Sequence, residues 1–262
     1  MTISSAYFDV NSIQVPDCSV RTQVITGKRI MMGVSLANRR FTLPFMDALG
    51  GWIADWSAAD LSVVIFDRCE ATNYSVFRGL TEKQAIQRAV HRANELRRAF
   101  ARRLATSLVP TTILLESELW DRNCAQIGPT YAAVSECYRN NPLFVSDVQK
   151  QVQLNVALRL EKGPKQDKKL LANLAAEYVL RELAVFDVVF RSGLADTEVY
   201  PGDPLFVKER MWRGDYTGLS RLAINGHAPW FVNISFLSSR KGADARTECL
   251  RTHVRKAAEH SR

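Results

Sequence analysis

The sequence predicts an α/β fold: a single Rossmann-like domain in which helices flank a mostly parallel sheet. Short apolar runs typical of buried strands recur along the chain, and longer segments with helical periodicity separate them. No long linker or internal repeat divides the 262 residues, a length that suits one large α/β domain. Alternating strands and helices indicate a parallel sheet. We divide the chain into an irregular lead-in (1–28), the Rossmann-like domain (29–240) and a basic tail (241–262).

The opening unit of this fold is a strand, a helix and a second strand. RIMMGVSL (29–36) is a short apolar run, and LPFMDALGGWIADW (43–56) has apolar residues at helical spacing. DLSVVIFD (60–67) is rich in β-branched residues and is bounded by aspartates. TTILLES (111–117) is a third strand candidate, which supports a sheet of several parallel strands.

The remaining segments extend this alternation. Residues 82–108 contain no Gly or Pro, follow Thr81 as a candidate N-cap, and are expected to form the longest helix. Further helices are expected over 120–141, interrupted near Gly128-Pro129, and then around 144–160 and over 166–186. TEVYPGD contains a short strand, and 228–237 forms another.

Composition limits the function classes. The formal net charge of +8 favours a polyanionic partner such as nucleic acid. The five cysteines are widely spaced and show no metal-ligand pattern, so we expect reduced thiols and no metal. No apolar run is long enough for a membrane span, and no signal peptide is visible, which predicts a cytoplasmic protein with no membrane partner. GxGxxG and P-loop motifs are absent, so no nucleotide cofactor is expected.

Candidate catalytic residues stand at predicted strand ends. Ser35 follows the first strand, where open parallel sheets form their ligand crevice, and Gly33 would keep the backbone beside it approachable. A serine in such a turn can equally cap a helix or bond to a neighbouring amide. Tyr200 and Asp203 follow the short strand in EVYPGD, which is also ordinary turn chemistry.

A second pair of candidates lies on the helix predicted over 166–186. Tyr178 and Glu182 are four residues apart, so both point from one face and can reach one small ligand. Together they could bind an ammonium group and shuttle a proton. Alternatively, Tyr178 packs beneath the sheet and Glu182 pairs with Arg181 or Arg191.

The long helix predicted after Thr81 has a basic face. At about 100° per residue, its basic side chains fall within an arc of roughly 140°, opposite the apolar ones. The basic set is Arg88, His91, Arg92, Arg98, Arg102 and Arg103, and the apolar set is Ile86, Ala89, Val90, Ala93, Leu96, Phe100 and Leu104. Arg97 falls on the apolar side, where we expect it to snorkel or pair. Guanidinium groups bind phosphates bidentately, so the face suits a nucleic acid, although it could be merely solvated.

Three segments together resemble the signature regions of the cyclodipeptide synthase family. They are GVSLANRRFT (33–42), AEYVLRELAVF (176–186) and EVYPGD (198–203), in the family's order and approximate spacing. The likeness covers roughly residues 29–205. It implies a fold similar to the catalytic domain of the class I tyrosyl- and tryptophanyl-tRNA synthetases, whose two ATP-binding signatures are missing here.

The resemblance also implies roles for the candidate residues. The serine matching Ser35 accepts the first aminoacyl group as an ester, and the residues matching Tyr178 and Glu182 hold its amine. Tyr200 would position the aminoacyl group and assist transfer. Asn38 and Asp203 would be supporting polar groups, and the basic helix would contact tRNA through Arg88, Arg92, Arg98, Arg102 and Arg103.

One signature combines features of two branches of the family. One branch carries Asn, Tyr and His at three signature positions, and the other carries a variable residue, Tyr and Pro. The Tyr200-Pro201 step places the chain closer to the second branch, whereas Asn38 matches the first.

The resemblance predicts an aminoacyltransferase that makes a cyclic dipeptide (diketopiperazine) from two aminoacyl-tRNAs. The reaction would pass through a Ser-linked aminoacyl-enzyme and a dipeptidyl-enzyme. An aminoacyl-tRNA is already an activated ester, so no ATP, metal or other cofactor is expected. The alternatives are a non-catalytic RNA-binding module and a serine-dependent small-ester acyltransferase or hydrolase. The latter needs a base near Ser35, but His91, His227, His253 and His260 stand in no triad motif.

Two acidic residues bear on substrate choice. Glu116 and Glu198 stand where family relatives place apolar residues of the first aminoacyl pocket, which Met31, Gly33 and Val64 would also line. An ionised carboxylate buried without a partner is unfavourable, so we expect at least one substrate side chain to be small or polar. Alternatively, either glutamate turns outward or pairs with an arginine. We expect a monomer.

Overall fold

The computed structural model describes residues 7–14, 27–55, 57–160, 168–201, 206–219 and 230–237. Within them, one sheet has the strand order β1-β6-β5-β2-β3-β4. The strands are β1 (Tyr7–Gln14), β2 (Arg29–Ser35), β3 (Asp60–Phe66), β4 (Thr111–Leu115), β5 (Thr197–Tyr200) and β6 (Trp230–Leu237). Neighbouring strands are parallel except β1 and β6, which are antiparallel. The mostly parallel sheet predicted from the sequence is confirmed.

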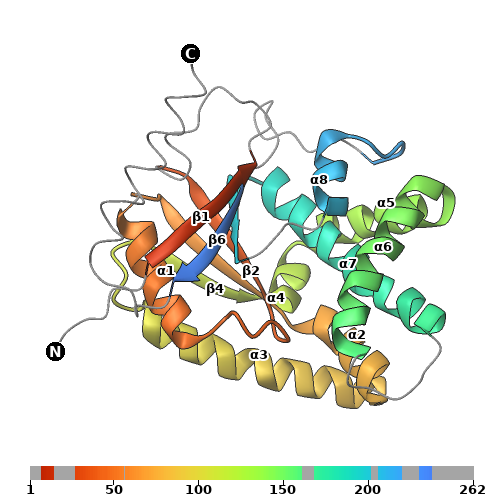
Figure 1. Cartoon of the computed structure of the whole chain (residues 1–262), viewed down its shortest axis with the longest axis horizontal. Helices are drawn as coiled ribbons and strands as arrows, with labels where there is room; N and C mark the ends of the chain where they lie inside the picture. The colour runs from red at the N-terminus through yellow and green to blue at the C-terminus, as the bar shows by residue number, and fades with distance from the viewer. Residues whose placement is uncertain are drawn as a thin grey trace.

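Eight helices accompany the sheet in this part of the chain. They are α1 (Leu43–Asp55), α2 (Asp67–Arg78), α3 (Glu82–Leu104), α4 (Glu116–Arg122), α5 (Cys124–Asn140), α6 (Pro142–Leu160), α7 (Lys168–Arg191) and α8 (Phe206–Arg213). Figure 1 shows α5, α6, α7 and α8 grouped to one side of the sheet, with α3 along the lower edge of the view. None of the described helices is both long enough and apolar enough to cross a membrane.

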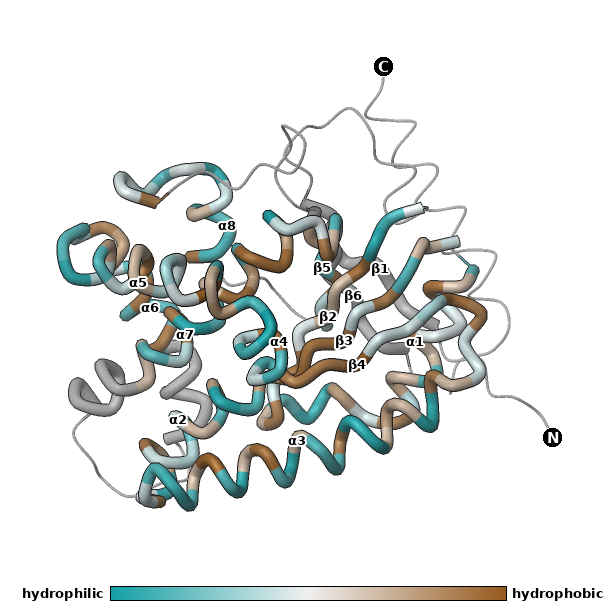
Figure 2. Tube along the Cα trace, turned by 180° about the vertical axis from the view of Figure 1, so that it is seen from behind, coloured by the Kyte–Doolittle hydropathy of each residue, from teal (hydrophilic) through white to brown (hydrophobic). Residues whose placement is uncertain are grey.

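The sheet carries a hydrophobic core on each face, because consecutive side chains of a strand point in opposite directions. On β2, Ile30, Met32 and Val34 pack against α1 and against Phe100 of α3. Met31, between them, packs on the other side with α7. β3 and β4 are hydrophobic along most of their length (Figure 2), as expected of strands covered on both faces. The result is a three-layer sandwich with α1 and α3 on one face and α7 on the other.

Strand order reverses at β2. From β2 the sheet continues to β3 and β4 on one side and to β5 and β6 on the other. Open parallel sheets bind ligands outside the carboxyl ends of the strands at such a switch point. The two strands that flank it end at Ser35 and Tyr200, so the fold brings these chain ends next to each other.

The structure corrects the prediction for the N-terminal segment. Residues 1–28 were expected to form an irregular lead-in, but Tyr7–Gln14 form β1 and pair with β6. The pairing register shifts between Val10 and Ser12. A bulge of this kind disturbs the regular alternation of a strand, which explains why this segment shows no sustained period of two.

Two helix predictions also need correction. α3 ends at Leu104 and is one residue shorter than α7, with 23 residues against 24, so it is not the longest helix. The interruption expected at Gly128-Pro129 lies instead at Asn123, between α4 and α5. The Asn123 side chain donates to the Leu119 carbonyl at 3.0 Å, and the Asn123 carbonyl accepts the first hydrogen bonds of α5. Two short helices, α2 and α8, were not predicted.

Candidate active site

Alternation along the strands gathers several predicted site residues on one face of the sheet. Met31 faces α7, and by alternation so do Gly33 and Ser35, at the carboxyl end of the same strand. On β3, Val64 shares this face. On β5, Val199 packs in the opposite core, so Glu198 faces α7. Tyr200, at the end of the strand, contacts both cores, and its ring packs against Phe41.

Gly33 allows α7 to approach β2 closely. A Cβ atom at this position would lie 3.0 Å from Cε2 of Phe66 and 3.1 Å from Cζ of Phe186, which belongs to α7. A larger residue would therefore push the helix or the two rings away. The turn after α7 lies at the start of β2, where Arg29 donates to the carbonyl of Gly193. The part of α7 that carries Tyr178 and Glu182 therefore extends towards the carboxyl edge of the sheet, where Ser35 is partly exposed.

The loop after β2 is tied to the end of β5. The amide nitrogen of Asn38 donates to the hydroxyl oxygen of Tyr200 at 3.0 Å, and Arg40 donates to the carbonyl of Pro201 at 2.6 Å. Because the Tyr200 oxygen accepts the Asn38 bond, its own proton remains available to another group. Burial and the nearby Glu182 raise the pKa of Tyr200 to about 12, so the phenol is protonated at neutral pH.

Tyr178 and Glu182 occupy one face of α7, as their spacing predicted. Burial raises the pKa of Glu182 to about 7, Lys208 opposes this shift, and Glu198 adds to it. At neutral pH, Glu182 can therefore either hold or accept a proton. Burial is the main cause, and the charge of Glu182 the second, that raises the pKa of Tyr178 well above its usual range.

The alternative pairings of Glu182 are not found. Arg181 lies 3.4 Å from Oε1 of Glu116, and Arg191 lies 2.6 Å from Asp187. No hydrogen bond or ion pair joins Glu182 to another residue in the described part of the chain. Its carboxyl group is therefore not committed to a partner in this part of the chain.

The two pocket acids are both buried and both paired with cations. Glu116 accepts a hydrogen bond from the backbone of Cys69 at 3.1 Å as well as the contact from Arg181. Glu198 forms an ion pair with Lys208 of α8. The sequence argument for a small or polar substrate assumed carboxylates without partners, and that premise does not hold. Pairing with arginine, the alternative, is observed for Glu116, whereas Glu198 pairs with lysine.

Lys208 was not among the residues singled out from the sequence. It lies on a short helix that was not predicted, and in VKERMWR nothing distinguishes it from a solvent-exposed lysine. Its burial is visible only in the structure, where it is 2% exposed. Asp203, one of the predicted supporting groups, lies outside the described residues.

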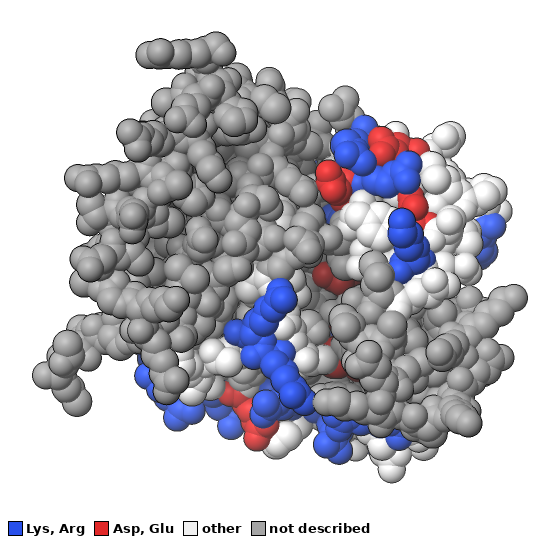
Figure 3. Space-filling view, in the orientation of Figure 1, with Lys and Arg blue, Asp and Glu red and all other residues white. Residues whose placement is uncertain are grey.

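The basic face of α3 is exposed as predicted. Arg88, Arg92, Arg98, Arg102 and Arg103 all lie at the surface, and blue side chains line the lower edge of the molecule where α3 runs (Figure 3). Arg92 pairs with Glu95 and Arg103 with Asp47. Among the described residues, Arg98 and Arg102 have no ion-pair partner. Their guanidinium groups are available to an external anion.

The opposite face of α3 is buried in part: Val90 and Leu96 are half-buried, and Ile86 is exposed. Ala89, Ala93, Phe100 and Leu104 are buried, but Ile86 is 39% exposed, contrary to its predicted place on the packed face. Ile86 lies in the first turns of the helix, away from the sheet, where α3 packs mainly against the short helix α2. The expectation that Arg97 pairs is confirmed, since it contacts Glu118 at 2.5 Å.

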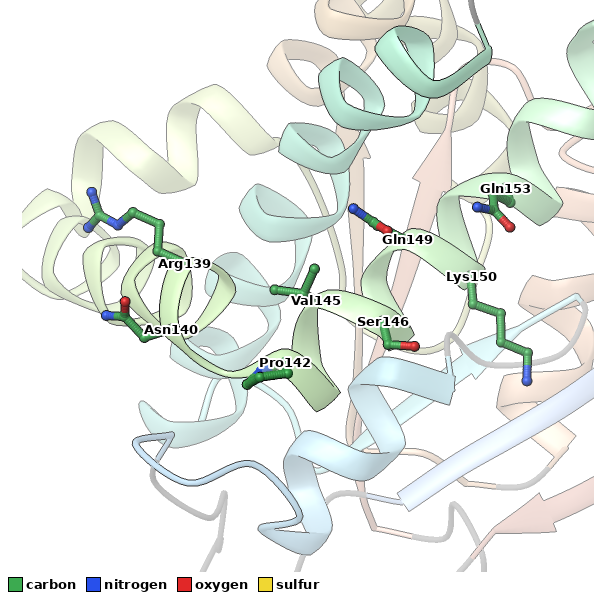
Figure 4. Close-up of a pocket in the computed structure, with 8 residues that line it drawn as sticks. All are labelled: Arg139, Asn140, Pro142, Val145, Ser146, Gln149, Lys150 and Gln153. Atoms are coloured by element: carbon green, nitrogen blue, oxygen red, sulfur yellow. The ribbon is translucent and has the colours of Figure 1, made fainter.

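A separate groove lies at the corner between α5 and α6. It has a volume of about 460 Å³, and its walls include Arg139, Ser146 and Lys150 (Figure 4). No residue predicted for the site lines this groove. It is therefore distinct from the group of side chains at the carboxyl edge of the sheet.

The family model for cyclodipeptide synthases matches residues 16–188. No curated protein sequence matches the chain.

Several solved structures share the fold. A cyclodipeptide synthase from Fluoribacter dumoffii has a TM-score of 0.71 at 14% identity, covering 88% of this chain and 100% of its own. A Mycobacterium tuberculosis protein, described as showing that cyclodipeptide synthetases are related to type I tRNA synthetases, scores 0.63 at 14% identity, covering 86% and 93%. A synthase from Candidatus Glomeribacter gigasporarum bound to Phe-tRNAPhe scores 0.56 at 18% identity, covering 81% and 88%.

Proposed function

The chain belongs to the cyclodipeptide synthase family, and on that premise we propose that it joins two aminoacyl groups, each taken from an aminoacyl-tRNA, through intermediates linked to Ser35. The observation that supports this most is the grouping of functional side chains at the switch point. Ser35 and Tyr200 end the two central strands, and Tyr178 and Glu182 face them from α7. Neither a plain RNA-binding module nor a classical ester hydrolase would require this grouping.

In the first step, the Ser35 hydroxyl attacks the carbonyl carbon of an aminoacyl-tRNA. A new ester bond forms to the serine oxygen, the bond to the tRNA ribose oxygen breaks, and the serine proton passes to that oxygen. The reaction exchanges one ester for another, so it needs no further activation. Tyr178 and Glu182 would hold the amine of the bound aminoacyl group, for which a buried carboxyl with a pKa near neutrality is suited.

In the second step, the bound amine attacks the carbonyl of a second aminoacyl-tRNA. The amide bond forms, the second tRNA leaves, and a dipeptide remains esterified to Ser35. The free amine of the dipeptide then attacks this ester, closes the ring and releases the serine. Tyr200 is the proposed partner in this last proton transfer, because its oxygen accepts from Asn38 while its proton stays available.

The arginine face of α3 is the proposed tRNA contact. Exposed guanidinium groups without internal partners suit phosphodiester groups, and Arg98 and Arg102 have this property among the described residues. Arg88, Arg92 and Arg103 extend the same surface.

For the first aminoacyl pocket, we propose Met31, Gly33 and Val64 as lining residues, with Glu116 and Glu198 held in ion pairs, and a small or polar side chain as the preferred substrate. The support is now the guanidinium of Arg181 above Glu116. Its Nε atom is buried and has no hydrogen-bond partner in the described part of the chain. An apolar substrate would leave this donor unsatisfied, whereas a polar one or a water molecule could bond to it. The Tyr200-Pro201 step remains our reason to place the chain nearer the branch with Tyr and Pro.

The proposal is tested with a mixture of charged tRNAs, with products identified by mass spectrometry. We expect cyclic dipeptides from the wild type and none from Ser35→Ala, which removes only the nucleophilic oxygen. A labelled aminoacyl group should be trapped on the wild type but not on Ser35→Ala. Ser107→Ala, in the turn between α3 and β4, is a matched control that should behave like the wild type.

Two outcomes would contradict parts of this proposal. Equal trapping on the wild type and on Ser35→Ala would exclude Ser35 as the nucleophile. Tight tRNA binding without any product would favour the RNA-binding alternative. In the same survey, products containing mainly Leu, Phe or Tyr would contradict the polar pocket.

A further inference from the structure

Lys208 occupies an unusual position for a lysine. Its side chain is 2% exposed and forms an ion pair with Glu198, which is equally buried. Its ammonium nitrogen lies 3.8 Å from the ring centroid of Phe186, and the rings of Trp212 and Phe231 lie at 5.4 and 5.6 Å. A buried ammonium is unfavourable unless it is paired, and here a carboxylate and three aromatic faces compensate for the lost hydration.

This cage lies directly beside the proposed amine-binding group. Phe186, whose ring carries the ammonium, is four residues after Glu182 on α7. Residues four apart on a helix are neighbours on one face, so the ring against which Lys208 packs lies on the same face of α7 as Glu182. Glu198 lies on the same side, two residues before Tyr200 on β5.

The charges around Glu182 come from several elements. Lys208 of α8 is the cation that acts on it, and Glu198 of β5 and Glu116 of α4 are the anions. The remaining titratable groups that face it are Tyr178 of α7, Tyr200 of β5 and Cys69 of α2, and burial raises the pKa of each of them. These three groups are therefore neutral at neutral pH. Among the described residues that act on Glu182, only Lys208 opposes the effects of burial and of the two acidic neighbours.

We propose that Lys208 is a positioning residue for aminoacyl transfer: from its aromatic cage it neutralises Glu198 and keeps the carboxylate form of Glu182 accessible. In that form Glu182 can hold the substrate ammonium and take one proton from it, which leaves a neutral, nucleophilic amine and a protonated carboxyl. The inference rests on the proposed function in one respect, namely that Glu182 binds the amine.

Two substitutions in the ion pair should have opposite effects on Glu182. Lys208→Met removes the cation, so Glu182 should titrate at higher pH. Glu198→Gln removes an anion and keeps the cation, so Glu182 should titrate at lower pH. A purely structural role would predict the same kind of damage from both, because both break the same ion pair.

The titration of Glu182 can be followed by NMR of protein labelled with 13C at the glutamate carboxyl groups. The signal is assigned by its loss in Glu182→Gln. We expect a displacement of about one pH unit in each direction, a tenfold change in the ratio of ionised to protonated Glu182. The low-pH limb of the rate of product formation should move in the same direction as the midpoint. Lys150→Met is the control, since Lys150 is exposed and lies 5.5 Å from the ring of Phe206, and it should leave both unchanged.

Lys208→Met leaves Glu198 buried without a cation and can fail to fold. The double variant Lys208→Met/Glu198→Gln avoids this. It should move the titration midpoint of Glu182 in the same direction as Lys208→Met, because Lys208 acts on Glu182 more strongly than Glu198 does. An unchanged midpoint, or displacement of both single variants in one direction, overturns the inference. A Glu182 midpoint that moves while the low-pH limb of the rate of product formation stays in place also overturns the inference. Product formation by the wild type tests the proposed function separately.

Discussion

Ser35 and Tyr200 owe their positions to the alternation of side chains along a strand. Each is the last residue of its strand, and alternation places Ser35 on the face that α7 covers, whereas the Tyr200 ring contacts both cores. Burial and the nearby Glu182 keep Tyr200 protonated, and the hydrogen bond from Asn38 occupies its oxygen. Because Asn38 donates to the phenol oxygen, the proton of Tyr200 cannot be committed to Asn38.

This arrangement predicts a step-specific effect of Tyr200→Phe. Loss of the hydroxyl should leave acylation of Ser35 largely intact but slow ring closure roughly 100-fold, in the range observed for a positioned proton-transfer group. Intact-protein mass spectrometry should then show dipeptidyl-enzyme accumulating after mixing with charged tRNAs. Tyr138→Phe, whose ring packs against Phe144 away from the site, serves as the control. Absence of any acyl-enzyme in Tyr200→Phe would assign Tyr200 to an earlier step.

Individual site residues differed in how far the sequence could locate them. Strand ends and a helical spacing of four made Ser35, Tyr178, Glu182 and Tyr200 candidates, and the resemblance of their three segments to the family's signature regions selected them. The cations that pair with Glu116 and Glu198 could not be selected in this way, because pairing depends on how α7 and α8 pack on the sheet. A buried lysine such as Lys208 has the same local sequence features as an exposed one.

Elements were predictable where the local signal was strong. β2, β3 and β4 are apolar runs with clear boundaries, and α3 begins at its Thr81 cap. β1 escaped prediction because it is an edge strand with a register shift, and its stability comes from pairing with β6, more than 200 residues later in the chain. α8 is a short amphipathic helix of eight residues, for which contacts with the rest of the molecule matter more than propensity.

The exposed face of α3 leads to a prediction about salt dependence. Arg98→Glu combined with Arg102→Glu should weaken tRNA binding and flatten the slope of log affinity against log salt by up to about two, since each lost phosphate contact releases fewer counterions. The control is Arg139→Glu with Arg213→Glu, which makes the same change in net charge on α5 and α8. An unchanged slope in the α3 variant, or an equal change in the control, would mean that this face is only solvated.

At the scale of the molecule, the site depends on contacts that join distant segments. Arg29 at the start of β2 pairs with Asp196 just before β5 at 2.7 Å, which fixes the two central strands at their amino ends. Asp147 of α6 accepts hydrogen bonds from Arg210 at 2.8 Å and from Tyr216 at 3.0 Å, which holds α8 against the helical layer while Lys208 reaches inward. The charge environment of Glu182 therefore depends on the packing of the whole α7 face.

The burial of Glu182 among other acids favours function but lowers the stability of the fold, and this destabilisation depends on pH. The pKa of Glu182 is about 7 in the folded protein, against an ordinary value of 4.5. Between these values the folded state binds more protons than the unfolded state, so stability falls as pH rises. Below pH 4.5 Glu182 is protonated in both states and does not change the free energy of unfolding. Above pH 7 the destabilisation by Glu182 is complete.

Glu182→Gln should therefore abolish product formation and yet stabilise the fold at alkaline pH. Relative to the wild type, we expect an increase in the free energy of unfolding on the order of 2 kcal/mol at pH 8 and close to none at pH 4.5. Urea titrations at several pH values measure this difference. Glu136→Gln, at an exposed residue paired with Arg139, should show no such trend. If the stability difference between Glu182→Gln and the wild type were the same at both pH values, Glu182 would not be held among buried acids, and its proposed role as the group that accepts the amine proton would lose its physical basis.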